Sequence, residues 1–398
     1  MTSFSVRFLG CKVSQTDAQE VRERLLREGH GERSDGAEVA VINTCCVTHE
    51  AVRKSRHAVS RASRTHARVY VTGCGANLRH SAFDGIGDNV VVVARRSEET
   101  PAVVAGDVGA IGCVADDARL ERVRAFVKVQ DGCSFSCNFC VVPLVRGASR
   151  SRPAAAVLSE IRRRVAQGHK EVVLTGINLG CYRDRAAGFS LPRLVREAGA
   201  TPGLARLRLS SIEVNHVNEQ LVTALRETPT VARHLHVPLQ SGDDAVLRAM
   251  ARRYTSATYL RRLDGLKDFN LTTDVIVGFP GEDDEAFERT LAVVSAAGIT
   301  KVHVFPYSPR PGTLTERADT VAAPVKKERA ARLRAASHDA CVRRWRAKLG
   351  SADAVLVDRP GRGYGDDYSP WLVSRQAAIG ELVRVRAAAV TEEGVVAA

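Results

Sequence analysis

Residues 131–143 read DGCSFSCNFCVVP and carry Cys133, Cys137 and Cys140 in the spacing C-x3-C-x2-C. Three thiols this close together indicate a metal site, because the thiolate is a strong metal ligand. Structural zinc sites and ordinary iron–sulphur clusters take four protein ligands. Either a fourth ligand comes from elsewhere in the chain, or one coordination position is left open.

The chain around this stretch alternates apolar runs with helical stretches. Helices are expected, for example, over residues 153–166 and 284–297, and strands are expected at 125–129, 171–176, 207–211, 234–239, 273–280 and 301–307. Six strand–helix units predict an incomplete (β/α)6 barrel, since a full barrel has eight. Cys133 then begins the loop after the first barrel strand, on the face where barrel enzymes carry their active sites.

The first ~100 residues predict a separate α/β domain with a doubly wound parallel sheet. Strands are expected at residues 5–10, 39–43, 69–72 and 90–94, and helices at 16–28, with Thr16 as N-cap, and 48–67. Cys11, Cys45 and Cys74 each directly follow one of these strands. The carboxyl ends of parallel strands share one edge of the sheet, so the three thiols are expected to form a second metal site. Cys46 should point away, because neighbouring residues on extended backbone face opposite sides.

The remaining segments read as a connector, a helix and a small β module. Residues 101–122 are a polar connector, and residues 325–350 form a basic helix ended by Gly350. Residues 351–398, with a GRGYG turn, predict a small all-β module. Cys113, Cys181 and Cys341 have no partners at ligand spacing and are expected to be structural.

Composition limits the class of protein. With 398 residues, 44% hydrophobic and 26% charged, the chain is expected to form two or three globular domains. It has no apolar run near the ~18 residues of a membrane helix, and its start does not resemble a secretory signal. We therefore expect a cytoplasmic protein that does not bind membranes, in which the ten cysteines form no disulphides and the clustered ones serve metal binding or catalysis. The net charge of +13 favours a polyanionic partner.

Glycines and polar residues recur where the barrel strands end, in TGINLG (175–180), SSIE (210–213), PLQSG (238–242) and GFPGE (278–282). Glycine lets the backbone approach a ligand closely. Their recurrence at successive strand ends predicts a binding mouth.

These motifs resemble those of radical S-adenosylmethionine (SAM) enzymes, whose C-x3-C-x2-C follows the first strand of an incomplete barrel. LGCKV, NTCCVT, TGCGAN, LTGINLGCY, HLHVPLQSGDDAVLRAMARRY and DVIVGFPGE further resemble the methylthiotransferase family over nearly the whole chain. The segment with GYGDDYSPWLV resembles that family's RNA-binding TRAM domain. GCKV and TGINLG are similar to the subgroup that methylthiolates threonylcarbamoyladenosine beside the tRNA anticodon, although Ser14 stands where that subgroup usually has asparagine.

The resemblance implies the cofactors and their ligands. One 4Fe–4S cluster is expected on Cys133, Cys137 and Cys140, with SAM on its open iron, to generate a 5′-deoxyadenosyl radical. An auxiliary 4Fe–4S cluster on Cys11, Cys45 and Cys74 is expected to hold the sulphur that is inserted, and a second SAM supplies the methyl group. The residues expected to contact SAM are Phe139, Gly176, Asn178, Glu213, Gln240 and Gly278. No catalytic residue beyond the cluster ligands is assigned.

The resemblance also implies a division of labour along the chain. Residues 1–100 would carry the auxiliary cluster, 123–324 the radical SAM barrel, and 351–398 the TRAM-like module, with the linker 101–122 and helix 325–350 between them. The expected partners are the tRNA anticodon stem-loop and an electron donor such as flavodoxin or ferredoxin. The basic stretches 48–67 and 326–348 are expected to contact phosphates.

Some roles stay open from sequence. Arg146, Arg150 and Arg152 could bind the anticodon backbone or hold the cluster loop, and His234, His236 and His303 are expected to be core or substrate-contacting rather than metal ligands. Two alternative functions are a methylthiotransferase acting on a ribosomal-protein aspartate, and a non-catalytic, metal-stabilised RNA-binding protein.

Overall fold

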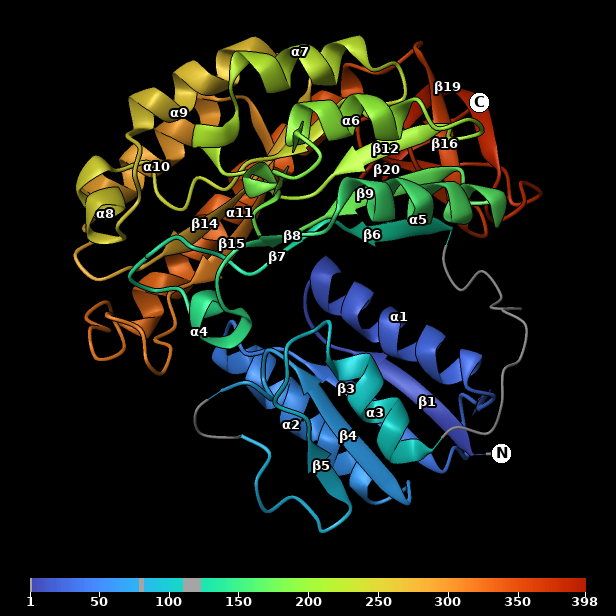
Figure 1. Ribbon diagram of the computed structural model, residues 1–398. Helices are drawn as coiled ribbons and strands as arrows, with labels where there is room; N and C mark the ends of the chain where they lie inside the picture. Colours follow the sequence, from blue (N-terminus) through green and yellow to red (C-terminus); the bar gives the residue numbers. More distant parts are fainter. Residues whose placement is uncertain (1, 79–81, 110–122) are drawn as a thin grey trace. The chain divides into compact units, whose positions relative to one another are not determined.

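The computed structural model describes residues 2–78, 82–109 and 123–398 (Figure 1). Cys113 and the second part of the expected connector lie outside these ranges. The chain divides into two compact units, which are described separately. One comprises Met1–Arg119, Asp131–Arg150 and Ser308–Glu316, and the other Leu120–Gln130, Ser151–Tyr307 and Arg317–Ala398. Within the described ranges, every helix is too short or too polar to cross a membrane.

The first unit contains a five-stranded parallel sheet in the order β2-β1-β3-β4-β5. Its strands are β1 (Ser3–Phe8), β2 (Gly31–Glu32), β3 (Val39–Thr44), β4 (Arg68–Gly73) and β5 (Val90–Val92). The two central strands, β3 and β4, are apolar runs with almost every residue buried, as expected for strands covered on both faces.

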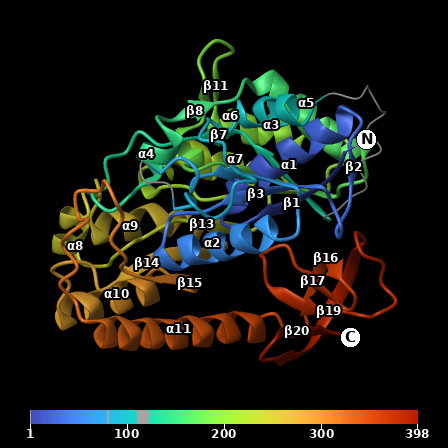
Figure 2. The same ribbon diagram turned by 90° about the horizontal axis from the view of Figure 1, so that it is seen from below.

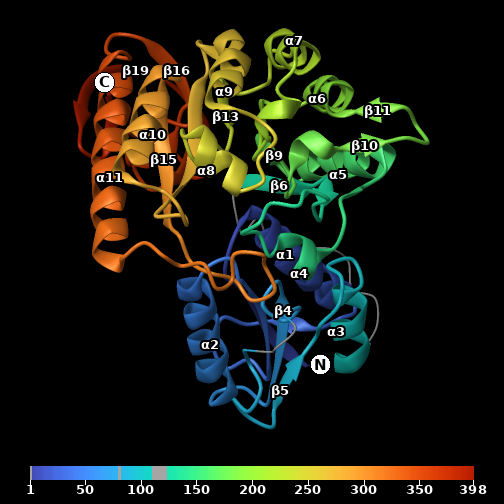
Figure 3. The ribbon, with the colours of Figure 1, turned by 90° about the vertical axis from the view of Figure 1, so that its left-hand side faces the viewer.

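Helices cover both faces of this sheet, as the doubly wound prediction requires. Val21 and Leu25 of α1 (Lys12–Arg27) share one apolar cluster with Val104 of α3 (Thr100–Val108). Val59 of α2 (His49–Ser63) belongs to the cluster on the other face (Figure 3). The Thr48 hydroxyl caps α2 by accepting from the N–H of Ala51 at 3.0 Å.

Two local predictions in this unit are wrong. The first helix begins at Lys12 with Cys11 at its N-cap, so Thr16 is not the cap, and its hydroxyl instead donates to the carbonyl of Val13. Residues assigned to the connector form α3, because the stretch TPAVVAGDV is apolar enough to cover the sheet beside α1.

Two short strands, β7 (Gln130–Asp131) and β8 (Arg150–Ser151), lie on either side of the three-cysteine loop. Between them lies the short helix α4 (Val142–Arg146), which ends at Gly147.

The second unit contains all six strands expected of the barrel. They are β6 (Arg124–Lys128), β9 (Glu171–Thr175), β12 (Arg206–Leu209), β13 (His234–His236), β14 (Asn270–Val277) and β15 (Ile299–Pro306). They form two three-stranded parallel sheets, β6-β9-β12 and β13-β14-β15. A parallel bridge between Leu207 and Val231 connects the sheets.

Helices follow these strands and share one large apolar core with them. They are α5 (Ala154–Ala166), α6 (Leu191–Gly199), α7 (Glu219–Glu227), α8 (Asp244–Ala249), α9 (Ser256–Leu263) and α10 (Asp284–Ala296). Polar side chains fix several N-termini; Asp283, for example, accepts from the N–H of Ala286 at 2.7 Å. A small hairpin, β10 (Arg183–Asp184) with β11 (Phe189–Ser190), and short 3-10 turns at Leu179–Cys181, Val214–His216 and Asp264–Leu266 complete the connections.

The long helix α11 (Ala323–Arg346) packs beside β15 and leads into a closed five-stranded β barrel (Figure 2). The barrel strands are β16 (Ala352–Arg359), β17 (Arg362–Tyr364), β18 (Pro370–Leu372), β19 (Leu382–Thr391) and β20 (Gly394–Ala397). Trp345 of α11 packs with Trp371 in the core of this barrel. The GRGYG stretch is a turn only at Gly361, and its next residues form β17.

Candidate metal centres and cofactor site

Cys11, Cys45 and Cys74 follow β1, β3 and β4, so all three lie at the carboxyl edge of the first sheet. Burial, together with the charges on Cys74 and Cys11, raises the pKa of Cys45 to about 11. Cys45 and Cys74 are buried and Cys11 is exposed. The three cysteines therefore lie at one edge of the sheet, as expected from the strands that precede them.

Gly10 allows the chain to pass close to these thiols. A side chain at this position would place its Cβ 3.1 Å from the Cβ and 3.3 Å from the Sγ of Cys45, and the φ of +127° also favours glycine. Ser14, which stands where asparagine is usual, places its hydroxyl 3.7 Å from the Sγ of Cys11.

Cys46 does not point away from the site, contrary to the expectation. Its thiol forms a hydrogen bond with Cys74, because β3 ends at Thr44 and strand alternation no longer applies to residues 45 and 46. This bond, and then the charge of Arg146, lower the pKa of Cys74 to about 7 although burial opposes the shift. The same bond raises the pKa of Cys46, so Cys74 is the thiol of this pair that ionises.

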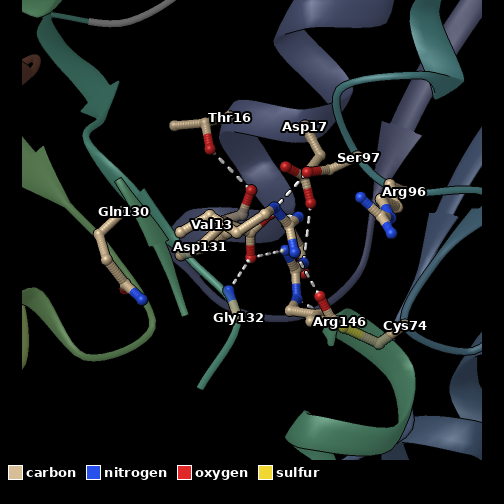
Figure 4. A network of polar contacts seen from close by, with 12 residues as sticks. Val13, Thr16, Asp17, Cys74, Arg96, Ser97, Gln130, Asp131, Gly132 and Arg146 are labelled. Carbon is tan, nitrogen blue, oxygen red and sulfur yellow. Dashed lines mark hydrogen bonds and ion pairs between the residues drawn. The ribbon is translucent and has the colours of Figure 1, made fainter. Parts of the chain in front are cut away.

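The guanidinium of Arg146 makes the second close contact with Cys74 (Figure 4). Its Nε donates to the Cys74 Sγ at 3.0 Å, and its other nitrogens pair with Asp17 at 2.8 Å and Asp131 at 2.9 Å. Burial alone would lower the pKa of Arg146, but the neighbouring Cys74, Asp17 and Asp131 charges hold it well above its usual value. Arg146 therefore remains a cation in the interior.

The other two arginines near the loop also make contacts within the protein. Arg150 pairs with Glu98 at 2.9 Å and donates to the carbonyl of Arg146 at 2.7 Å. Arg152 pairs with Glu160 at 2.7 Å and donates to the carbonyl of Lys128. Of the two roles left open by sequence, holding the loop is the one that these contacts support.

A cavity of about 350 Å³ adjoins this network and is lined by Cys74, Arg146 and Asn43, among others. The Oδ1 of Asn43 is buried without a hydrogen-bond partner among the described residues. Water or a small polar ligand can therefore reach the immediate surroundings of Cys74.

The C-x3-C-x2-C loop is held by its own backbone. The N–H of Cys133 donates to Gly147 at 3.0 Å, and the N–H of Cys140 donates to Cys137 at 3.1 Å. The N–H of Phe135 donates to the Cys133 Sγ at 3.4 Å. The thiols of Cys133, Cys137 and Cys140 are all partly accessible, as ligands of a reactive metal centre need to be.

The residues expected to contact SAM are divided between the two compact units. Phe139 belongs to the first unit, with the cluster loop. The others lie in the second unit. Gly176 and Gly278 directly follow β9 and β14, and Gln240 forms a parallel bridge with Val275 of β14. Asn178 and Glu213 lie three and four residues beyond the ends of β9 and β12. These five residues occupy successive carboxyl ends, where ligands of parallel sheets bind.

Several of these five residues show features of a binding site. The Oδ1 of Asn178 is buried with no partner among the described residues. Gln240 has a φ of +69°, a conformation that is rare outside glycine and is concentrated at functional positions. A side chain at Gly278 would come within 2.4 Å of Lys326. The carboxylate of Glu213 accepts from the N–H of Asn215 at 2.9 Å, which fixes its orientation.

Asp274 and two of the three barrel histidines form a group that sequence reasoning did not assemble. His236, Asp274 and His303 bring their ligand atoms within 4.8 Å of one another. His236 is held on both ring nitrogens, by Thr272 at 2.9 Å and by Asp274 at 3.3 Å. The hydroxyl of Thr272 and the carboxylate of Asp274 thus hold the imidazole ring of His236 in place.

The two basic helices differ in their exposure. On α2, Arg61 and the following Arg64 are exposed. On α11, by contrast, several cations are used within the protein: Lys326 pairs with Asp319, Arg329 with Glu282, and Arg344 with Asp367. Other cations of α11, among them Lys327, Arg334, Arg343 and Arg346, are exposed, so both helices present charge that suits phosphates.

Comparisons with known proteins agree with this arrangement. The radical SAM superfamily matches residues 127–294, and the uncharacterized protein family UPF0004 matches residues 3–94. The chain is 33% identical to the threonylcarbamoyladenosine tRNA methylthiotransferase MtaB of Thermotoga maritima, covering 100% of this chain and 96% of that protein. The Bacillus subtilis protein of the same name is 35% identical, over 85% of this chain and 80% of its own.

A solved structure has a similar fold. The radical S-adenosylmethionine methyltransferase TsrM from Kitasatospora setae aligns with a TM-score of 0.57 over 79% of this chain and 77% of that chain, at 14% identity. At this identity the likeness concerns the fold alone, whereas the full-length relatives decide the family. The chain belongs to the methylthiotransferase family of radical SAM enzymes.

Proposed function

We propose that this protein converts N6-threonylcarbamoyladenosine next to the tRNA anticodon into its 2-methylthio derivative. The observation that carries the proposal is the presence, in one compact unit, of two sets of three cysteines. Each set is one thiol short of the four ligands of an ordinary cluster. The full-length relatives named as threonylcarbamoyladenosine tRNA methylthiotransferases support the choice of nucleoside.

Thiolates suit iron–sulphur clusters, so the two cysteine sets fit the proposed groups. One 4Fe–4S cluster would be held by Cys133, Cys137 and Cys140, and the auxiliary cluster by Cys11, Cys45 and Cys74. The buried, unpartnered Oδ1 of Asn178 supports a polar ligand at the strand ends. When bound, SAM and the reduced cluster supply the radical that an unactivated C–H bond requires.

The chain's own residues bind and position these groups. Gly132 turns the backbone into the cysteine loop, and the N–H of Phe135 donates to the Cys133 Sγ. The fixed carboxylate of Glu213 and the backbone of Gly176, Gln240 and Gly278 would bind the polar parts of SAM, with Phe139 packing from the cluster loop.

The proposal extends to the domains and partners. Residues 1–100 would carry the auxiliary site, 123–324 an incomplete radical SAM barrel, and 351–398 a TRAM-like module that binds the anticodon stem-loop. The closed β barrel at the C-terminal end and the exposed arginines of α2 support RNA binding. An electron donor such as flavodoxin or ferredoxin would reduce the cluster, in the cytoplasm where tRNA is available.

Nucleoside mass spectrometry tests the proposal directly. tRNA from a strain lacking this gene should lose the 2-methylthio form of threonylcarbamoyladenosine and accumulate its precursor, and the wild-type gene should restore it. Unchanged tRNA together with an altered ribosomal-protein aspartate would refute the proposal in favour of the first alternative. A colourless, anaerobically purified protein that contains stoichiometric zinc would favour the non-catalytic alternative.

A further inference from the structure

Arg146 connects the two cysteine sets. It is the last residue of α4 and lies six positions after Cys140, and its side chain is only 5% exposed. Through its three nitrogens it contacts Cys74 of the auxiliary set, Asp17 of the helix that begins after Cys11, and Asp131, two residues before Cys133 (Figure 4). Arg146, at the end of the cysteine loop, thus binds both Asp131 at the start of the loop and Cys74 of the other cysteine set.

Asp131, one of the acceptors of Arg146, is held in place by further hydrogen bonds. Asp131 accepts from the Ser97 hydroxyl at 2.5 Å and from the N–H of Gly132 at 2.7 Å. Both carboxylates and the guanidinium are buried, and a cation in such a position is retained only when its partners are well placed. Only arginine can make the three contacts together, because lysine has one nitrogen and lacks the planar fork.

A donor on a cluster thiolate changes the cluster itself. Hydrogen bonds to the ligand sulphurs and nearby positive charge stabilise the more reduced state and so raise the reduction potential. The Nε–H of Arg146 lies 3.0 Å from the Cys74 Sγ, at hydrogen-bond distance for a sulphur acceptor.

We propose that Arg146 is a positioning residue for this reaction: it holds the C-x3-C-x2-C loop through Asp131 and tunes the auxiliary cluster through Cys74. The proposal rests on the proposed function, because it requires a cluster on Cys11, Cys45 and Cys74. A change at this one residue should therefore alter sulphur insertion more than SAM cleavage.

The test uses a parent protein in which Cys133, Cys137 and Cys140 are all changed to alanine, so that only the auxiliary cluster can form. In this parent we compare Arg146→Gln, Arg146→Lys and the control Arg24→Gln, which removes an exposed cation paired with Glu28 in the same unit. Iron content, the EPR spectrum of the reduced cluster and its midpoint potential are measured anaerobically. Arg146→Lys keeps the positive charge and provides a folded variant if the glutamine variant is unstable.

Arg146→Gln should move the potential in the negative direction and alter the EPR spectrum, Arg146→Lys should give a smaller shift, and Arg24→Gln should give none. In the otherwise intact protein, Arg146→Lys should lower methylthiolated product about tenfold, as expected for loss of one charge-assisted hydrogen bond. Its SAM cleavage should fall by less than product formation.

The outcomes separate the two proposals. A parent protein that binds no iron would refute the auxiliary cluster and with it the proposed function. A parent that binds about four irons, but whose potential and EPR spectrum are the same with arginine, lysine or glutamine at position 146, would overturn the role of Arg146 alone.

Discussion

The Nε of Arg208 lies 2.8 Å from the Oε1 of Glu171, and both side chains are only 1% exposed. Arg206 pairs with the second oxygen of Glu171 at 3.1 Å. Burial opposes ionisation of Glu171, but these arginines hold its pKa below the usual value. Arg208 also donates to the carbonyls of Gly365 and Asp366. The Arg208–Glu171 ion pair therefore links β9 and β12 to the small β barrel.

Replacing Glu171 with alanine should strongly destabilise the second unit. The change leaves Arg206 and Arg208 buried without their carboxylate, and breaking a buried ion pair in this way costs about 3–5 kcal/mol. Chemical unfolding followed by circular dichroism measures the loss. Asp268→Asn, which breaks an exposed pair with Arg226, is the control and should change stability by about 1 kcal/mol or less. Equal effects of the two changes would contradict the importance of the buried pair.

Stability at acidic pH should depend on Asp367. Burial opposes its ionisation, but Lys348 and Arg344 lower its pKa to about 2. The folded pKa lies below the unfolded value of about 3.9, so the stabilisation is complete above that pH and disappears as the pH falls toward 2. Its size is about 2–3 kcal/mol.

Tryptophan fluorescence can follow this acid transition, since the protein's two tryptophans, Trp345 and Trp371, both pack in the small β barrel. Asp367→Asn should lower stability at neutral pH and flatten the dependence between pH 4 and 2. The exposed control Asp264→Asn should keep the dependence of the wild type. An unaltered acid profile in Asp367→Asn would rule out this source of pH dependence.

Gly132→Ala should disturb the cysteine loop. The φ of Gly132 is +67°, and an added Cβ would lie 2.2 Å from the backbone oxygen of Ala148, so the backbone must move. We expect iron content to fall from about eight to about four, because none of Cys11, Cys45 and Cys74 lies in this turn. Gly36→Ala has a similar φ, +65°, but open space around it, and should keep full iron content. If Gly132→Ala kept about eight irons, the turn at Gly132 would not be required for cluster binding.

Two cysteine variants should separate the two half-reactions. Cys45→Ala should leave SAM cleavage intact and abolish sulphur insertion, whereas Cys137→Ala should abolish both. Each should retain about four irons. Cleavage is measured as 5′-deoxyadenosine and insertion as methylthiolated nucleoside. Cys341→Ala, whose thiol donates to the carbonyl of Thr300 at 3.0 Å, is the control and should keep both activities. Sulphur insertion by Cys45→Ala would exclude the auxiliary assignment.

The exposed arginines of α2 should contribute to tRNA affinity. Each phosphate contact that is lost lowers the slope of log affinity against log salt by about 0.7 to 0.9. The double variant Arg61→Gln and Arg64→Gln should therefore bind tRNA more weakly and lose about 1.4 to 1.8 of this slope. Fluorescence anisotropy over a salt series measures it. Arg226→Gln, on the second unit, is the control and should keep the wild-type slope. Equal slopes for the wild type, the double variant and Arg226→Gln would show that the RNA does not contact Arg61 and Arg64.

The position of the three cysteines of the first domain at one edge of the sheet could be predicted from the strands that precede them. Cys11, Cys45 and Cys74 each follow an apolar run, and parallel pairing places such positions at one edge. The same reasoning failed at Cys46, because it assumed that the extended backbone continues past Thr44. Hydrophobic periodicity locates strands, but it does not tell where a strand ends to within one residue.

The surroundings of Arg146 were not accessible from sequence. Its partners Asp17 and Cys74 lie 129 and 72 positions away, and neither stands in a pattern that marks an arginine contact. A buried cation is visible only once packing is known, because an arginine in a loop is more often exposed. The helix α3 was missed for a related reason: a short apolar stretch beside glycines reads as a connector until its covering sheet is present.

The composition of the first unit has a consequence for biosynthesis. Residues Ser308–Glu316 belong to it, and there Arg310 donates to the carbonyl of Cys46, 264 positions earlier. The ribosome releases these residues only after more than three quarters of the chain has been made. The unit that holds both cysteine sets therefore gains its last contacts only after most of the chain has been made, and such long-range closure is slow. We therefore expect any cluster bound by this unit to be inserted late, after residues 308–316 have been made.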